Sequence, residues 1–139
     1  MDKIKLYKNN IKKNILGNVY KYLDENLFGS KIAEVYFTTI KKNKIKAWKL
    51  NKSSDQFIYV IKGSVLFVLC DTEFKKKNIK KYILGKKQLY QKIYIPKNVW
   101  YGFMGLHKEN LIANSLRKKH KECKFINLEH INSKIPYSW

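Results

Sequence analysis

Two stretches of the chain run from one strand pattern through a sharp corner into another, and they restrict the fold more than any other feature. The first, residues 45–63, is predicted to form a strand, a polar turn and a second strand that ends at Gly63. The second, residues 90–105, contains an Ile-Pro-Lys-Asn corner between two strands. Proline fixes its own φ and has no backbone donor, so Pro96 belongs at a corner. These stretches predict paired strands with tight connections.

Further short strands are predicted on both sides of these stretches, and no sustained helical periodicity or internal repeat occurs. This pattern predicts an all-β fold, a barrel or two-sheet jelly roll. The 139 residues suffice for a single domain. We expect residues 31–116 to form the barrel. Residues 1–30 are expected to supply irregular strands or an arm, as part of the barrel or of a dimer interface. Residues 117–139 are expected to pack on the barrel as a C-terminal segment.

The formal net charge is +20, which by itself suggests nucleic acid or an anionic surface as a partner. However, almost all of the positive charge is lysine, and Arg117 is the only arginine. Proteins that read nucleic acids usually depend on arginine for bidentate contacts. A basic nucleic-acid-binding protein is therefore the weakest of the functional alternatives, and no specific nucleic-acid partner is expected. The lysine excess is interpreted mainly as generic surface charge, and attraction of a small anionic substrate stays open.

The chain carries no sign of a secreted, membrane-bound or zinc-binding protein. Cys70 and Cys123 lack the spacing of a disulfide framework or a zinc site. No apolar run has the length of a signal-peptide core or a membrane span. His107, His120 and His130 are scattered, and no His-x-His pair occurs. We therefore expect a cytoplasmic protein without metal, cofactor or membrane partner.

Strand alternation places Lys49 and Asn51 on one face of their strand and Trp48 and Leu50 on the other. Two arrangements stay open. Either Lys49 and Asn51 face a polar barrel interior, or they face outward while the two hydrophobic residues fill the core. In the first arrangement a lysine inside a partly apolar barrel has a lowered pKa and becomes a candidate base. Tyr101 is then a candidate acid or oxyanion donor, its alternative being an aromatic residue at the rim.

The spacing of the two stretches resembles the paired motifs of the cupin family of small β-barrels. Six residues separate Gln56 from Gly63, and Pro96 lies five positions before Tyr101, as in those motifs. Asn43 and Asn98 stand where the family has glycine, and asparagine tolerates the left-handed backbone conformation. The four positions that hold the metal in the family are occupied by other residues here: Lys49, Asn51, Gln56 and Tyr101.

Most of residues 28–139 resembles, in order, the dTDP-4-dehydrorhamnose 3,5-epimerase-like sugar-nucleotide cupins. The matching segments are AEVYFTTI, NKIKAWKLNK, QFIYVIKGSVLFVLCD, YIPKNVWYGFMGL and IPYSW. The family is metal-free, and its full-length enzymes use a histidine base in an R-G-x-H-x-Q motif and a later tyrosine acid. By resemblance, the Arg, His and Gln of that motif correspond to Lys46, Lys49 and Asn51.

The resemblance extends to four further positions, and it shows which catalytic groups are replaced. The family's strand-opening lysine corresponds to Gln56, and its tyrosine acid falls near Asn114. Its histidine before Gly-Phe corresponds to Tyr101, and its aspartate is kept as Asp71. Base and acid are both absent, so an epimerisation would need a pair rebuilt from Lys49, Tyr101 or His120.

The resemblance implies an epimerase or isomerase of a nucleotide-linked 4-keto-6-deoxy sugar in surface polysaccharide biosynthesis. Lys46 and neighbouring lysines would bind the diphosphate. The remaining substrate-binding candidates are Asn51, Gln56, Asp71 and Asn114. The missing family base and acid leave a second alternative open, a non-catalytic module that binds a sugar or sugar nucleotide. Family members form dimers, so a homodimer is expected in which the N-terminal segment adds strands to the partner subunit.

Overall fold

The computed structural model describes residues 3–24 and 31–139, and this part of the chain is all-β, as the sequence predicts. The strands are β1 (Lys5–Lys8), β2 (Ile11–Lys12), β3 (Val19–Tyr20), β4 (Glu34–Lys41), β5 (Ile45–Asn51), β6 (Gln56–Lys62), β7 (Ser64–Cys70), β8 (Lys80–Gly85), β9 (Tyr90–Ile95), β10 (Trp100–Gly105), β11 (Glu109–Leu116) and β12 (Phe125–Asn127), with 3-10 turns η1 (Lys76–Asn78) and η2 (His120–Glu122).

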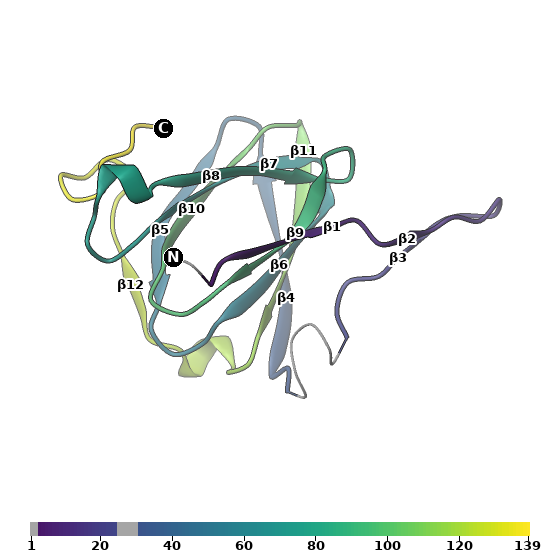
Figure 1. The fold of residues 1–139 in the computed structure, drawn as a ribbon, viewed down its shortest axis with the longest axis horizontal. Helices are drawn as coiled ribbons and strands as arrows, with labels where there is room; N and C mark the ends of the chain where they lie inside the picture. Colours follow the sequence, from purple (N-terminus) through teal and green to yellow (C-terminus); the bar gives the residue numbers. More distant parts are fainter. Residues whose placement is uncertain (1–2, 25–30) are drawn as a thin grey trace.

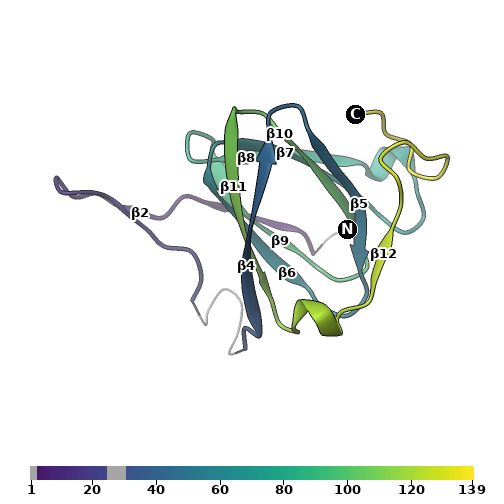
Figure 2. The same cartoon turned by 180° about the vertical axis from the view of Figure 1, so that it is seen from behind.

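Two five-stranded antiparallel sheets face each other as a jelly roll (Figure 1). One sheet has the order β1-β9-β6-β11-β4, and the other has the order β12-β5-β10-β7-β8. The short β2–β3 hairpin extends away from this body. Seen from behind, β4 and β12 lie at the free edges of the two sheets (Figure 2).

The corners follow from residues that tolerate unusual backbone angles. Gly63 joins β6 to β7 with φ +83°, a conformation that favours glycine. Asn43 and Asn98 have φ of 62° and 63°, so the asparagines that replace the family's glycines adopt the expected left-handed conformation. Pro96 follows the last residue of β9. These corners fix the register of the strands that form the interior.

Side chains on the inner faces of the two sheets form the main hydrophobic core, which includes Phe67, Leu69, Ile93 and Ile112. A second core lies on the outer face of the sheet that contains β5. Its members are Trp48, Leu50, Val68, Cys70, Trp100 and Ile135, with Tyr137 and Trp139 packed against them. The C-terminal segment therefore covers the outer face of this sheet.

The segment after β11 contains the 3-10 turn His120–Glu122 and then forms the short strand β12. Strand β12 pairs with β5, with Asn127 opposite Lys49. This pairing gives hydrogen-bond partners to the backbone groups along the otherwise free edge of β5, and residues 125–127 are therefore extended.

The N-terminal segment contacts the outer face of the other sheet. The Tyr22 hydroxyl donates to the Phe57 carbonyl oxygen at 2.7 Å and lies 2.8 Å from Ser115 Oγ. Lys92 Nζ donates to the Tyr22 carbonyl oxygen at 3.1 Å. These bonds hold the segment after the β2–β3 hairpin against the barrel, and β1 pairs with β9 at the sheet edge.

Candidate active site

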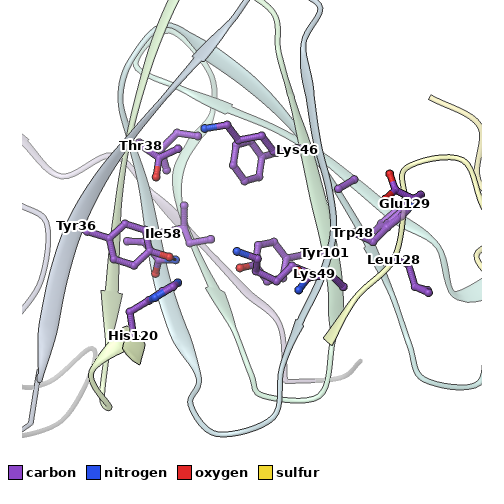
Figure 3. A pocket seen from close by; sticks show the side chains of 15 residues that line it. Tyr36, Thr38, Lys46, Trp48, Lys49, Ile58, Tyr101, His120, Leu128 and Glu129 are labelled. Carbon is purple, nitrogen blue, oxygen red and sulfur yellow. Dashed lines mark hydrogen bonds between the residues drawn. The ribbon is translucent and has the colours of Figure 1, made fainter. Parts of the chain in front are cut away.

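A pocket of about 670 Å³ lies between the two sheets (Figure 3). Strands from both sheets and the C-terminal segment line it. The lining residues are Tyr36, Thr38, Lys46, Ala47, Trp48, Lys49, Ile58, Tyr101, Phe103, Ile112, Asn114, His120, Asn127, Leu128 and Glu129. The volume is in the range of small-molecule sites, and the lining combines apolar walls with a few polar groups, as such sites do.

Lys49 and Tyr101 are neighbours on the inner face of their sheet, because they are directly opposite in the β5–β10 pairing. The Lys49 side chain is half-buried, and its Nζ lies 4.9 Å from the centre of the Phe125 ring. Burial, and to a smaller extent the charge of Lys46, lower the pKa of Lys49. A larger fraction of Lys49 is therefore neutral, and able to accept a proton, than for a lysine in water.

A pair of buried amides connects the two sheets behind the pocket. Asn114 Nδ2 donates to Gln56 Oε1 at 2.8 Å and to the Tyr36 hydroxyl oxygen at 2.9 Å. Gln56 is also hydrogen-bonded to the Tyr101 side chain. The four side chains form one network, and two phenol groups stand at its ends.

The two tyrosines keep their protons at neutral pH. Burial, then the proximity of Tyr36, raise the pKa of Tyr101, and the hydrogen bond with Gln56 lowers it by less. Burial likewise raises the pKa of Tyr36, against a smaller lowering by the bond with Asn114. Both phenols extend toward the middle of the pocket, Tyr36 from β4 and Tyr101 from β10. Neutral phenols are hydrogen-bond donors, suited to a carbonyl oxygen that gains negative charge.

His120 and Lys46 occupy the ends of the pocket. The His120 ring lies 5.5 Å from the Tyr36 ring, edge to face, and 4.8 Å from the Phe125 ring. Lys46 is exposed, and its Nζ donates to the Thr39 carbonyl oxygen at 3.0 Å. An imidazole and a lysine ammonium group thus lie on either side of the Lys49–Tyr101 pair.

Five of the sequence-predicted site residues line the pocket: Lys46, Lys49, Tyr101, Asn114 and His120. Gln56 lies directly behind it, through Asn114. Two other candidates are elsewhere. Asn51 caps its own turn, since its Oδ1 accepts from the backbone nitrogens of Ser53 and Ser54. Asp71 accepts from the Asn78 side chain and the Lys75 backbone in the loop after β7.

Sequence reasoning did not single out Tyr36 or the wall formed by Asn127, Leu128 and Glu129. For Tyr36 a signal existed, because alternation sets Glu34, Tyr36 and Thr38 on the face opposite Val35 and Phe37. Which face points inward depends on the partner sheet, so alternation alone could not select it. Residues 127–129 lie in a polar segment without a motif.

Within residues 3–24 and 31–139, no group of three or more His, Cys, Asp and Glu side chains is arranged to hold a metal ion. In the same ranges, no helix is long and apolar enough to cross a membrane.

Comparison with solved structures finds the same fold in enzymes that act on nucleotide sugars. The structure of a dTDP sugar isomerase from Desulfovibrio desulfuricans G20 superposes with a TM-score of 0.88 at 26% identity, covering 99% of this chain and 91% of that one. A dTDP-6-deoxy-D-glucose-3,5-epimerase from Legionella pneumophila, in complex with dTDP-4-keto-L-rhamnose, superposes with a TM-score of 0.82 at 17% identity, covering 100% and 79%.

A third similar structure is the TDP-quinovose 3,4-ketoisomerase of Campylobacter jejuni, with a TM-score of 0.77 at 16% identity, covering 92% of this chain and 95% of that one. No family model and no curated protein matches the sequence. The predicted resemblance to the 3,5-epimerase-like cupins is confirmed by these structures.

Proposed function

We propose that this protein is an epimerase or isomerase of a nucleotide-linked 4-keto-6-deoxy sugar, acting in the cytoplasm in surface polysaccharide biosynthesis. The observation that carries the proposal is the polar interior of the pocket. Lys49, with its lowered pKa, stands beside two protonated phenols on opposite sheets. Similar folds include both 3,5-epimerases and a 3,4-ketoisomerase, which supports this reaction class.

In the proposed reaction, neutral Lys49 removes a proton from the carbon next to the ketone. The electron pair of that C–H bond forms the double bond of an enolate, and the negative charge moves to the ketone oxygen. Tyr36 and Tyr101 stabilise this oxygen by donating hydrogen bonds. Reprotonation of carbon from the opposite face, with His120 as the candidate acid, gives the epimer. For the keto isomer, the former ketone carbon takes the proton instead. Its oxygen gains a proton and becomes a hydroxyl, and the hydroxyl on the carbon deprotonated first loses its proton and becomes the new ketone.

The phosphates and the sugar have separate binding groups in this proposal. Lys46 at the exposed end of the pocket takes the diphosphate as a point charge. The strongly positive chain raises the local concentration of the anionic substrate. Glu129 follows β12, which pairs with the strand that carries Lys46, and it is the only carboxylate among the lining residues.

Solvent deuterium incorporation tests this function. The protein is incubated in heavy water with TDP-4-keto-6-deoxyglucose, and label at the carbons next to the ketone is measured by NMR. The proposal predicts label in the wild type and about 10²- to 10⁴-fold slower labelling in Lys49→Met. Binding without label would instead favour the second candidate, a non-catalytic sugar-nucleotide module, for which the replaced family base and acid argue.

We also propose that the protein is a homodimer in which the N-terminal arm reaches the partner. Ile15 and Leu16 at the hairpin turn are 100% and 95% exposed, and Phe37 on the edge strand β4 is 66% exposed. Light scattering is expected to give the mass of a dimer for the wild type and of a monomer for an Ile15→Ser, Leu16→Ser variant. A monomeric wild type would contradict this assembly.

A further inference from the structure

Asn114 has a hydrogen-bonding atom that nothing in the described chain uses. The residue is 5% exposed and lines the pocket. Its Nδ2 donates to Tyr36 and Gln56, whereas its Oδ1 is buried and has no hydrogen-bond partner among the described residues. Buried acceptors are almost always paired, so an unpaired one in a pocket marks where a donor from a ligand is expected.

The same network determines which way the tyrosine protons point. The Tyr36 oxygen accepts from Asn114, so its own O–H hydrogen is left to donate elsewhere. The bond with Gln56 lowers the pKa of Tyr101. Donation from an amide nitrogen to a phenol oxygen has this effect, because it stabilises the charged form, so Tyr101 is assigned as the acceptor in this bond. The Tyr101 hydrogen is likewise free to donate into the pocket.

Three residues that line the pocket therefore offer polar atoms in a defined pattern, with O–H donors from Tyr36 and Tyr101 and one acceptor, the buried Asn114 Oδ1. A ketone oxygen only accepts hydrogen bonds, and a hydroxyl on the adjacent carbon can donate one. The pattern is thus complementary to an α-hydroxy ketone, in which these two groups are neighbours.

We propose that Asn114 is a specificity-determining residue that accepts a hydrogen bond from a hydroxyl next to the ketone of the substrate. The assignment rests on the proposed function, because it takes the ligand to be a keto sugar. Through its Nδ2 the same amide holds the Tyr36 hydroxyl with its hydrogen free for the ketone oxygen. Asn114 therefore selects the substrate with one atom and positions a donor with the other.

The test compares two ligands that differ by one hydroxyl. Equilibrium dissociation constants are measured by calorimetry for TDP-4-keto-6-deoxyglucose and for the same nucleotide sugar lacking the hydroxyl next to the ketone at C3. The wild type is expected to bind the deoxy analogue about 10- to 100-fold more weakly, because that analogue leaves the buried acceptor unpaired. Equal affinities would overturn the assignment of Asn114 while leaving the proposed function standing.

Two variants test whether Asn114 is the residue that distinguishes the two ligands. Asn114→Leu removes the acceptor and is expected to bring the ratio of the two dissociation constants close to one. Tyr36→Phe is the matched control, since it removes a donor to the ketone, which both ligands carry, and should weaken both equally with the ratio retained. An unchanged ratio in a folded Asn114→Leu protein would refute the assignment. If that variant does not fold, the wild-type ratio decides alone.

Failure of the wild type to bind either nucleotide sugar would overturn the proposed function and this assignment together. The deuterium experiment distinguishes the two failures, because labelling of the 3-hydroxy sugar with equal binding of both ligands rejects only the role of Asn114.

Discussion

Strand β5 presents Lys49 to the pocket between the sheets, whereas Trp48, which also borders that pocket, packs in the apolar core beneath the C-terminal segment. The two residues are adjacent, yet their surroundings differ in polarity. Trp48 is 1% exposed and packs against Tyr137 and Trp139, with ring centres at 6.1 and 5.2 Å. Lys49 faces Tyr101 and the polar network. The inner face of this sheet thus carries the candidate chemistry, and the outer face provides stability.

The comparison teaches that burial of a hydrophobic side chain does not identify the interior of a barrel. Trp48 and Leu50 are the more hydrophobic pair of β5, and both are buried, but on the outside of the sheet. The C-terminal segment makes this possible by covering that face. A polar pocket can therefore lie between the sheets, because the apolar side chains of β5 are buried on the outer face instead.

The largest expected effect concerns the outer face. Trp48→Ala should lower the free energy of unfolding by about 3–5 kcal/mol, because it removes a large, fully buried ring. Urea unfolding measures the loss. Ile131→Ala, in the same C-terminal segment but 81% exposed, is the control and should change stability by less than about 0.5 kcal/mol. A loss near the control value would show that the outer face is not a core.

On the inner face, Lys49→Met should have the opposite profile. Its unfolding free energy should stay the same or rise, since a partly desolvated charge is removed, while deuterium incorporation into the keto sugar falls about 10²- to 10⁴-fold. Lys52→Met, in the exposed turn after β5, should label at the wild-type rate. Equal rates for Lys49→Met and Lys52→Met would remove Lys49 from the mechanism.

A pair of tyrosine variants sharpens the contrast between pocket and exterior. Tyr36→Phe should slow labelling about 10- to 100-fold, because one donor to the enolate oxygen is lost. Tyr22→Phe removes a hydroxyl bonded to Phe57 and Ser115 outside the barrel. It should cost about 1 kcal/mol of stability and leave the labelling rate unchanged. Labelling slowed equally by both variants would contradict the separation.

The smallest expected effect is on the pH dependence of stability. The pKa of Lys49 is lowered in the folded state, so the folded protein binds fewer protons than the unfolded chain between that pKa and the usual lysine range. Stability should therefore rise with pH across this window. Lys92, whose pKa burial also lowers, contributes in the same direction. Subtracting the Lys49→Met profile isolates the Lys49 part, and a flat difference would contradict the lowered pKa.

Local chemistry made much of the fold predictable. Gly63, Asn98 and Pro96 each limit their own backbone, so the corners could be placed without knowledge of the partner strands. Lys49 and Tyr101 could be paired only through the spacing of the two motifs. Tyr36 could not be found because its role depends on Asn114, which is 78 residues away in the sequence. Alternation places Asn51 on the same face of β5 as Lys49. Its side chain does not reach the pocket, because its Oδ1 accepts a hydrogen bond from the Ser54 backbone nitrogen in the turn after β5.

The central claim is that a keto sugar binds between the sheets against Lys49 and the two phenols. A crystal structure of the protein with TDP-4-keto-6-deoxyglucose tests it most directly. The account predicts the ketone oxygen within roughly 2.6–3.2 Å of the Tyr36 and Tyr101 hydroxyls, with Lys49 Nζ facing the adjacent carbon. A sugar bound outside the pocket, or a pocket in which the nucleobase contacts Lys49 and the ketone faces solvent, would contradict it.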